Sequence, residues 1–311
     1  MRVVASYILK SPMQAVLSAL VPAVLSLIAP SLLKLLLIYF SGIVVALVTL
    51  RMGPKQGLTV LLIALIATVS VGQLLGLDDT RALDLWSSVY IWVMIWLGAG
   101  VLHQTRSLAL MLEVVGLIAI LTILAFFVLV DDPIQVCLQL LQPMSEVLSR
   151  PDSGLSPAEV TTFTNSVAKY MIGGFAAFTV ISAVISLFIA RSWQAKLFNP
   201  GGFKQEFIAL RIGRQAGLLA IAIMLALMLS ETIWQQTSLV LVNFSFIVVF
   251  LSVVVGLAIV HGLVAQRDNK GYWLVWVYAL LIMLSTIIAP LLMTLALSDI
   301  WVDYRARFQK K

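Results

Sequence analysis

The segment from Arg191 to Arg211 holds the residues of this chain whose types and spacing best suit binding chemistry. Asn199-Pro200-Gly201-Gly202 breaks one helix, and Phe203 and Phe207, at helical spacing, begin the next. A glycine-rich helix start with basic residues nearby suits an anion, because its first backbone N–H groups are free. Two other interpretations stay open: an elbow whose aromatic side chains lie on the membrane surface, and a docking surface for a partner. The candidate docking or coupling residues here are Arg191, Trp193, Asn199, Pro200, Gly201, Gly202, Phe203, Glu206 and Arg211.

Glu113 is an acidic residue inside a long apolar stretch. It lies about two turns into residues 108–130, where an ionised carboxylate is costly unless it is paired or hydrated. That position makes it a functional candidate, although it is close enough to the helix end to reach Arg106 or water. Gln73 and Asn243 lie in other apolar stretches, where they either line a cavity or join helices by hydrogen bonds. Glu113, Asn243 and Gln73 are the candidate ligand-binding residues.

The C-terminal tail combines carboxylates and arginines with a tryptophan near a predicted helix end. Its candidate residues are Asp299, Trp301, Asp303, Arg305 and Arg307. The i,i+4 spacings 299–303 and 303–307 predict that one helix face carries two acids followed by a base. Such a row would form a local ion-pair network or, alternatively, would handle a proton or a ligand.

Apolar stretches of membrane-crossing length must position these residues. A transmembrane helix needs about 20 mostly apolar residues, because lipid offers the backbone no hydrogen-bond partners. The chain is 61% hydrophobic and 11% charged, against roughly 25% charged in soluble domains. We predict an all-α fold, a polytopic transmembrane bundle of about 8–10 helices forming one integral membrane domain over residues 1–311. The predicted helices are 13–29, 33–50, 58–76, 84–102, 108–130, 168–190, 216–235, 239–262, 272–289 and 291–304.

Two prolines and the charge distribution set the predicted topology. Ala29-Pro30-Ser31 and Ala289-Pro290 are the expected turns of the first and last helix pairs. The alternative at Pro290 is a helix that is kinked there and does not turn back. With ten crossings and a cytoplasmic N-terminus, 16 of the 20 Lys and Arg residues fall on the cytoplasmic side. The positive-inside rule therefore favours both termini in the cytoplasm, with the crossings in the inner (cytoplasmic) membrane.

Two segments outside the crossings are long enough to hold structure: an extracytoplasmic stretch, 131–167, and a cytoplasmic elbow, 191–215. The first contains an amphipathic helix that we expect in the interface plane. After it, Ser156-Pro157-Ala158-Glu159 is a capping box that starts a helix running into the sixth crossing. The apolar face of the amphipathic helix comprises Ile134, Cys137, Leu138, Leu141, Met144 and Leu148.

Composition and motifs give no support to several function classes. The net charge is +6, but the basic residues lie in short loops beside helix ends, which indicates topology and not nucleic-acid binding. The single cysteine, Cys137, cannot form an internal disulfide, and no Cys/His cluster has metal-ligand spacing. No nucleophile elbow or phosphate-binding loop is present. We therefore predict no cofactor, no metal and no enzymatic activity.

Ala15, Ala19 and Ala23 place small residues on one face of the first predicted helix. Such a face lets another helix approach closely, either within this protein or from a partner.

Three stretches resemble one family. They are Trp193-Gln-Ala-x-Leu-Phe-Asn-Pro-Gly-Gly-Phe203-x-x-Glu206-Phe, the Leu50-Arg-x-Gly loop and Asp299-x-Trp-x-Asp-Tyr-Arg-x-Arg307. Together they resemble the YybS-like bacterial membrane proteins, which are distantly similar to the S components of energy-coupling-factor vitamin transporters. S components dock their coupling subunit through a small-residue face on the first helix, and the resemblance implies that role for Ala15, Ala19 and Ala23. S components have six helices, and this chain has more.

Three functional hypotheses follow. The leading one is an S-component-like membrane protein that binds or transports a small solute, with the Arg191–Arg211 segment as its coupling surface. The second is a non-transporting scaffold that recruits membrane subunits or a cytoplasmic partner. The third is an intramembrane enzyme acting on a lipid. The bilayer is an expected partner in all three, and nucleic acid in none.

Overall fold

The computed structural model describes residues 2–76, 79–233, 238–266 and 271–307. Within these ranges the secondary structure is helical, without a strand, which confirms the predicted all-α class. The elements are α1 (Arg2–Ile8), α2 (Pro12–Leu25), α3 (Ser31–Met52), α4 (Pro54–Leu74), α5 (Asp79–Thr105), α6 (Leu108–Leu129), α7 (Pro133–Leu148), η1 (Pro151–Ser153), α8 (Pro157–Phe198), α9 (Gly202–Ile208), α10 (Arg214–Thr232), α11 (Leu239–Gln266), α12 (Tyr272–Met283), α13 (Ser285–Val302) and α14 (Tyr304–Arg307).

The described chain is a multi-pass membrane protein with eight helices long and apolar enough to cross a bilayer. They are α3, α4, α5, α6, α8, α10, α11 and α13; the pair α1 and α2, bent by 111°, would make a ninth. These numbers agree with a bundle of about 8–10 helices. Two of the ten predicted crossings are short, because α2 has 14 residues and α12 has 12. At about 1.5 Å per residue neither reaches across a core of about 30 Å.

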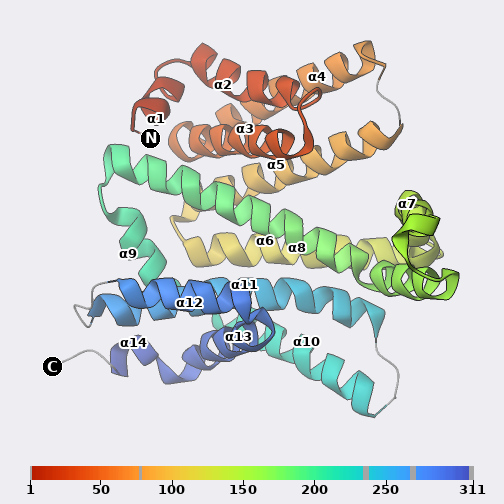
Figure 1. Cartoon of the computed structure of the whole chain (residues 1–311). Helices are drawn as coiled ribbons and strands as arrows, with labels where there is room; N and C mark the ends of the chain where they lie inside the picture. Colours follow the sequence, from red (N-terminus) through yellow and green to blue (C-terminus); the bar gives the residue numbers. More distant parts are fainter. Residues whose placement is uncertain (1, 77–78, 234–237, 267–270, 308–311) are drawn as a thin grey trace.

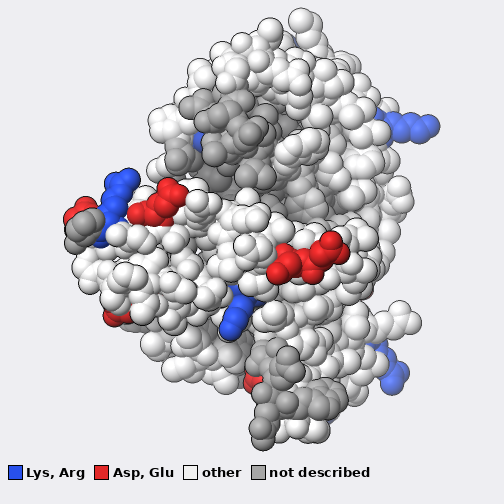
Figure 2. Space-filling model, turned by 90° about the vertical axis from the view of Figure 1, so that its right-hand side faces the viewer, with Lys and Arg blue, Asp and Glu red and all other residues white. Residues whose placement is uncertain are grey.

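Successive long helices alternate in direction, so α1 and α14 lie at the same end of the bundle (Figure 1). The turns between α3 and α4, between α5 and α6, and between α8 and α10 lie there too. We call this the basic end, because the turns there and the helix ends beside them hold Arg51, Lys55, Arg106 and the arginines from Arg191 to Arg214. Figure 2 views the opposite end, where blue basic side chains are few and scattered.

The last hairpin turns at Leu284 and not at Pro290. Leu284 leaves the helical conformation (φ −126°, ψ 44°), and Figure 1 shows α12 leaving the basic end and α13 returning to it. Pro290 lies inside α13, where its missing N–H removes one backbone hydrogen bond without ending the helix. The prediction of a turn at Ala289-Pro290 was therefore wrong in position.

The segment after α6 follows its local signals. Asp132 accepts the Gln135 N–H at 2.9 Å and caps α7, which lies across the ends of α6 and α8 (Figure 1). The Ser156–Glu159 capping box is present and starts α8 as predicted. With 42 residues, α8 is about 63 Å long at 1.5 Å per residue, so it continues past the membrane-crossing segment into the elbow.

Candidate functional site

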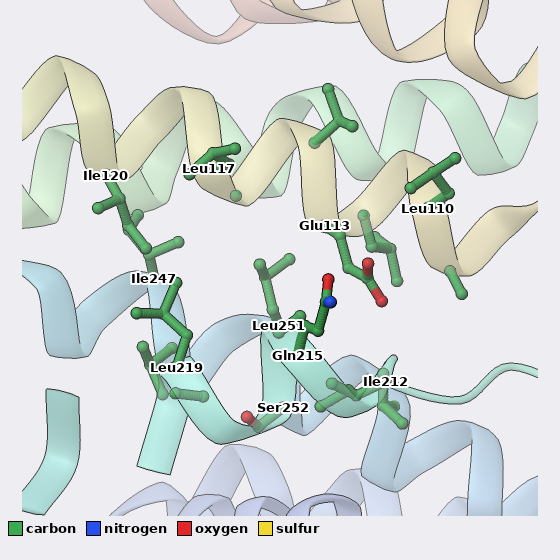
Figure 3. Close-up of a pocket in the computed structure, with 18 of the residues that line it drawn as sticks. Leu110, Glu113, Leu117, Ile120, Ile212, Gln215, Leu219, Ile247, Leu251 and Ser252 are labelled. Atoms are coloured by element: carbon green, nitrogen blue, oxygen red, sulfur yellow. The ribbon is translucent and has the colours of Figure 1, made fainter. Parts of the chain in front are cut away.

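A cavity of about 320 Å³ lies between α6, α10 and α11. Its walls are mostly leucine, isoleucine, valine and alanine side chains, and its polar lining consists of Glu113, Arg211, Gln215 and Ser252. Figure 3 shows Glu113 from α6 and Gln215 from α10 pointing toward one another across the space. The cavity therefore has a long apolar part and a polar part near the basic end.

The position of Glu113 follows from where two helices begin. The Ser107 hydroxyl accepts the Leu110 N–H at 3.2 Å and caps α6, so Glu113 falls in the second turn. Its Oε1 accepts the N–H of Gly213, the N-cap residue of α10, at 2.7 Å. A Cβ at Gly213 would lie 2.7 Å from that oxygen, so glycine permits the approach. A carboxylate at a helix N-terminus is favourable, because the peptide dipoles place partial positive charge there.

The Glu113 carboxylate therefore interacts with the start of α10. It does not pair with Arg106, one of the two partners that the sequence analysis named. Arg211, which also lines the cavity, forms an ion pair with Asp303 at 2.5 Å. This hydrogen bond to Arg211 lowers the pKa of Asp303 and raises the pKa of Arg211. Among the described residues, the Glu113 side chain accepts a hydrogen bond from the N–H of Gly213.

The cavity is open on one apolar side. Leu110 and Leu117 of α6 are 40% and 47% exposed, and Leu219 of α10 is 48% exposed. In a bilayer these side chains face hydrocarbon, so a molecule could reach the cavity sideways from the lipid.

The other two candidate ligand-binding residues lie elsewhere. Asn243 is fully buried near the start of α11. Its amide donates to the carbonyl oxygen of Lys169 at 2.9 Å, and its oxygen accepts the Gly173 N–H. Asn243 thus joins α11 to α8, and it does not line the Glu113 cavity. Gln73 is exposed at the end of α4. The structure does not bring the three residues together.

The elbow folds inward. Phe203 and Phe207 of α9 each pack edge-on against Phe188 of α8, with ring centroids 5.6 and 5.7 Å apart. Trp193 is buried and contacts the Phe40 ring. These three aromatic side chains pack against neighbouring helices and do not lie on the membrane surface, as one interpretation expected, whereas Phe198 is 51% exposed.

Charged and polar groups fix the elbow in place. Arg191 forms an ion pair with Glu206 through two nitrogens. Asn199 caps α8 and occupies the space that a Cβ at Gly202 would need, so the start of α9 is covered. Gly201 has a φ of +88°, a backbone conformation that favours glycine. The tip formed by Asn199, Pro200 and Gly201 is exposed.

The tail does not form the predicted row of charges on one helix face. Asp303 adopts a left-handed conformation (φ 47°) that ends α13, so residues 299, 303 and 307 do not share a helix. Asp299 pairs instead with Arg305 at 2.8 Å, and Asp303 pairs with Arg211. Trp301 and Arg307 are exposed. The ion-pair network is present, but it ties the tail to the elbow.

The alanine face of α2 is internal. Ala15, Ala19 and Ala23 are at most 1% exposed, and α2 packs against α3 and α4. The small side chains therefore serve close packing within the chain, and this face is not available to a coupling subunit.

Sequence reasoning missed Gly213 and Gln215. A glycine before an apolar run indicates the start of a helix, here α10 at Gly213. The neighbouring sequence does not indicate that Gly213 contacts Glu113, which lies 100 residues earlier. Across the described residues, no three or more His, Cys, Asp or Glu side chains gather as a metal site. No family model, curated protein or solved structure matches the chain significantly. The relationship to YybS-like proteins and to S components stays a prediction.

Proposed function

We propose that this protein binds a small amphipathic molecule within the membrane, in the cavity between α6, α10 and α11, as a solute-binding or transport protein of S-component-like character. The observation that carries the proposal is a single carboxylate, Glu113, at the polar end of an otherwise apolar cavity. A volume of about 320 Å³ lies at the small end of the range of about 300–1,000 Å³ typical of ligand sites.

The polar lining indicates the ligand's chemistry. Glu113 Oε1 accepts one backbone hydrogen bond, and Oε2 accepts none from the described residues. Gln215 adds an amide that can donate or accept. An ammonium group or another hydrogen-bond donor attached to an apolar body therefore suits the cavity best. The charge distribution favours the basic end on the cytoplasmic side, and the resemblance to YybS-like proteins implies a bacterial inner membrane. In that orientation the polar group would lie toward the cytoplasmic headgroups.

Binding is favoured over catalysis and over scaffolding. Glu113 is the one carboxylate in the described lining, and the nearby Arg211 is paired with Asp303. A reaction on a lipid would need further acids or bases that converge on the substrate. A scaffold would need an exposed surface, whereas Phe203 and Phe207 are packed inward. The part of the elbow that a membrane subunit or a cytoplasmic partner could contact is its exposed tip, residues 199–201.

The test compares three ligands that differ only in their polar group: dodecylamine, dodecanol and dodecanoic acid. Each is added to the purified protein in phosphatidylcholine nanodiscs, and the retained ligand is measured by native mass spectrometry. We expect retention in the order amine, alcohol, acid. Glu113→Gln, which keeps the size and the hydrogen bond to Gly213, should lower amine retention about tenfold, because a charged hydrogen bond is lost.

Glu231→Gln is the matched control, because Glu231 is an exposed glutamate near the far end of α10. It should retain the amine like the natural protein. Equal retention of all three ligands, or an unchanged amine signal in a folded Glu113→Gln protein, would contradict the proposal.

A further inference from the structure

A second cavity, of about 360 Å³, opens at the basic end between the C-terminal ends of α3, α5 and α8. Three arginines from three separate parts of the chain line it: Arg51, Arg106 and Arg191. His103 and Gln194 complete the polar lining together with Asn199. It shares no lining residue with the Glu113 cavity, which lies between other helices.

A chain of hydrogen bonds holds part of this lining in place. The carbonyl oxygen of Leu50 accepts from His103 Nδ1 at 3.1 Å and from Gln194 Nε2 at 2.9 Å. Because a carbonyl can only accept, His103 Nδ1 carries a hydrogen. Arg191 in turn donates to the Gln194 amide oxygen and pairs with Glu206. The groups are thus positioned before any ligand arrives, which lowers the entropic cost of binding.

The positive charge of the cavity is only partly compensated. Glu206 neutralises Arg191, whereas the Arg51 guanidinium lies over the Phe198 ring, 4.1 Å from its centroid. Among the described residues, Arg51 and Arg106 form no ion pair with a carboxylate. Helix C-termini offset some of this charge, but two guanidiniums remain available to an anion.

Topology alone does not explain this arrangement. The positive-inside rule needs basic residues in the loops of one side, and it does not require that they meet around one cavity. Arg106 also has a left-handed backbone (φ 55°), which is uncommon for a residue other than glycine, asparagine or aspartate. Such a conformation at the turn from α5 to α6 is the kind of local strain that concentrates at functional sites.

We propose that this cavity, which we call the arginine pocket, binds a phosphate monoester. Guanidinium groups match phosphate oxygens with two parallel hydrogen bonds, which a lysine does not provide. The pocket is much larger than a bare phosphate, and Leu50, Leu102 and Phe198 supply apolar wall for an organic remainder. The phosphate belongs either to a soluble metabolite or to a lipid headgroup, since the pocket lies where the bundle meets the expected headgroup region.

The experiment presents the same phosphate monoester in both forms. In the first arm, glycerol 3-phosphate is titrated calorimetrically into the purified full-length protein in phosphatidylcholine nanodiscs. In the second arm, the nanodiscs also contain phosphatidic acid, and the lipid retained by the protein is counted by native mass spectrometry. Saturable binding in the first arm identifies a soluble ligand, and specific retention in the second identifies a headgroup.

The variants decide whether the arginine pocket is responsible. Arg51→Gln and Arg106→Gln should each weaken binding of the successful probe about tenfold, as expected for one lost charged hydrogen bond. Arg106→Lys should recover part of the loss, because the charge returns without the planar fork. Arg307→Gln is the control, since Arg307 is exposed at the same end but outside the pocket.

Two results would overturn the proposal. One is that neither probe binds the natural protein saturably. The other is that Arg307→Gln weakens binding as much as Arg106→Gln, which would mean that the general positive charge of this end, and not the pocket, attracts anions.

Discussion

Asp299 and Arg305 form an ion pair whose Oδ2 and Nη2 atoms are 2.8 Å apart, and both side chains are more than nine-tenths buried. The same guanidinium donates to the carbonyl oxygens of Ile208 and Leu210, each at 2.8 Å. One arginine near the C-terminus therefore satisfies both a buried carboxylate in α13 and the backbone that leads from α9 to α10. This contact holds the tail against the elbow at Leu210, the residue before Arg211, which lines the Glu113 cavity.

Removing one partner of this buried pair should destabilise the protein strongly. Asp299→Asn leaves the Arg305 charge uncompensated, and Arg305→Met removes the guanidinium that donates to Asp299 and to two carbonyl oxygens. Each change should cost about 3–5 kcal/mol. Thermal unfolding in detergent should show clearly lowered midpoints for both, with the double variant losing less than the sum. Arg307→Met, at an exposed arginine two residues away, should leave the midpoint unchanged; an equal loss there would contradict the assignment.

Two adjacent glycines in α8 should respond oppositely to alanine. A Cβ at Gly173 would lie 2.7 Å from the Cα of Asn243 and 2.8 Å from its carbonyl oxygen, whereas a Cβ at Gly174 meets nothing within 4 Å. Gly173→Ala must therefore push α8 and α11 apart, at a cost of about 1–3 kcal/mol. Gly174→Ala should be neutral or stabilise by about 0.5–1 kcal/mol through helix propensity. Unfolding midpoints of the two variants measure the difference, and equal losses would count against the close contact.

The ion pair between Arg211 and Asp303 should weaken in acid. The hydrogen bond from Arg211 lowers the pKa of Asp303, so the folded protein holds this proton less tightly than the unfolded chain, whose aspartates titrate near about 3.9. The stabilisation is therefore complete above that pH and is lost as the pH falls through the lower, folded value. The gap in unfolding midpoint between the natural protein and Asp303→Asn should be present at neutral pH and close in acid below about pH 4.

The size of that gap should also fall with added salt, because both side chains are exposed to solvent and screened. Asp152→Asn is the control, because Asp152 is an exposed aspartate in η1, between α7 and α8. It should show no gap that closes in acid. A gap for Asp303→Asn that persists in acid would show that the carboxylate charge is not what stabilises the tail.

Local signals in the sequence determined the elements. The number of long apolar stretches predicted a membrane bundle, because lipid forces each crossing to satisfy its own backbone. The Ser156–Glu159 capping box predicted the start of α8, and the Asn-Pro-Gly-Gly run predicted its end near Asn199. These signals act within a few residues of the chain, so they can be read without knowing which helices are neighbours. The prediction of a turn at Pro290 was wrong, because Pro290 lies inside α13 without ending it and the chain reverses at Leu284.

Only the tertiary structure decided which charges meet. Asp303 pairs with an arginine 92 residues earlier, Glu113 accepts the N–H of Gly213, and three arginines from separate parts of the chain line one pocket. Membrane helices are apolar nearly all round, since lipid and neighbouring helices offer similar surroundings, and so their sequences carry little mark of the face that packs inward. The interhelical contacts depend on shape at positions such as Gly173 and Ala19, and these become visible only once the helices are assembled.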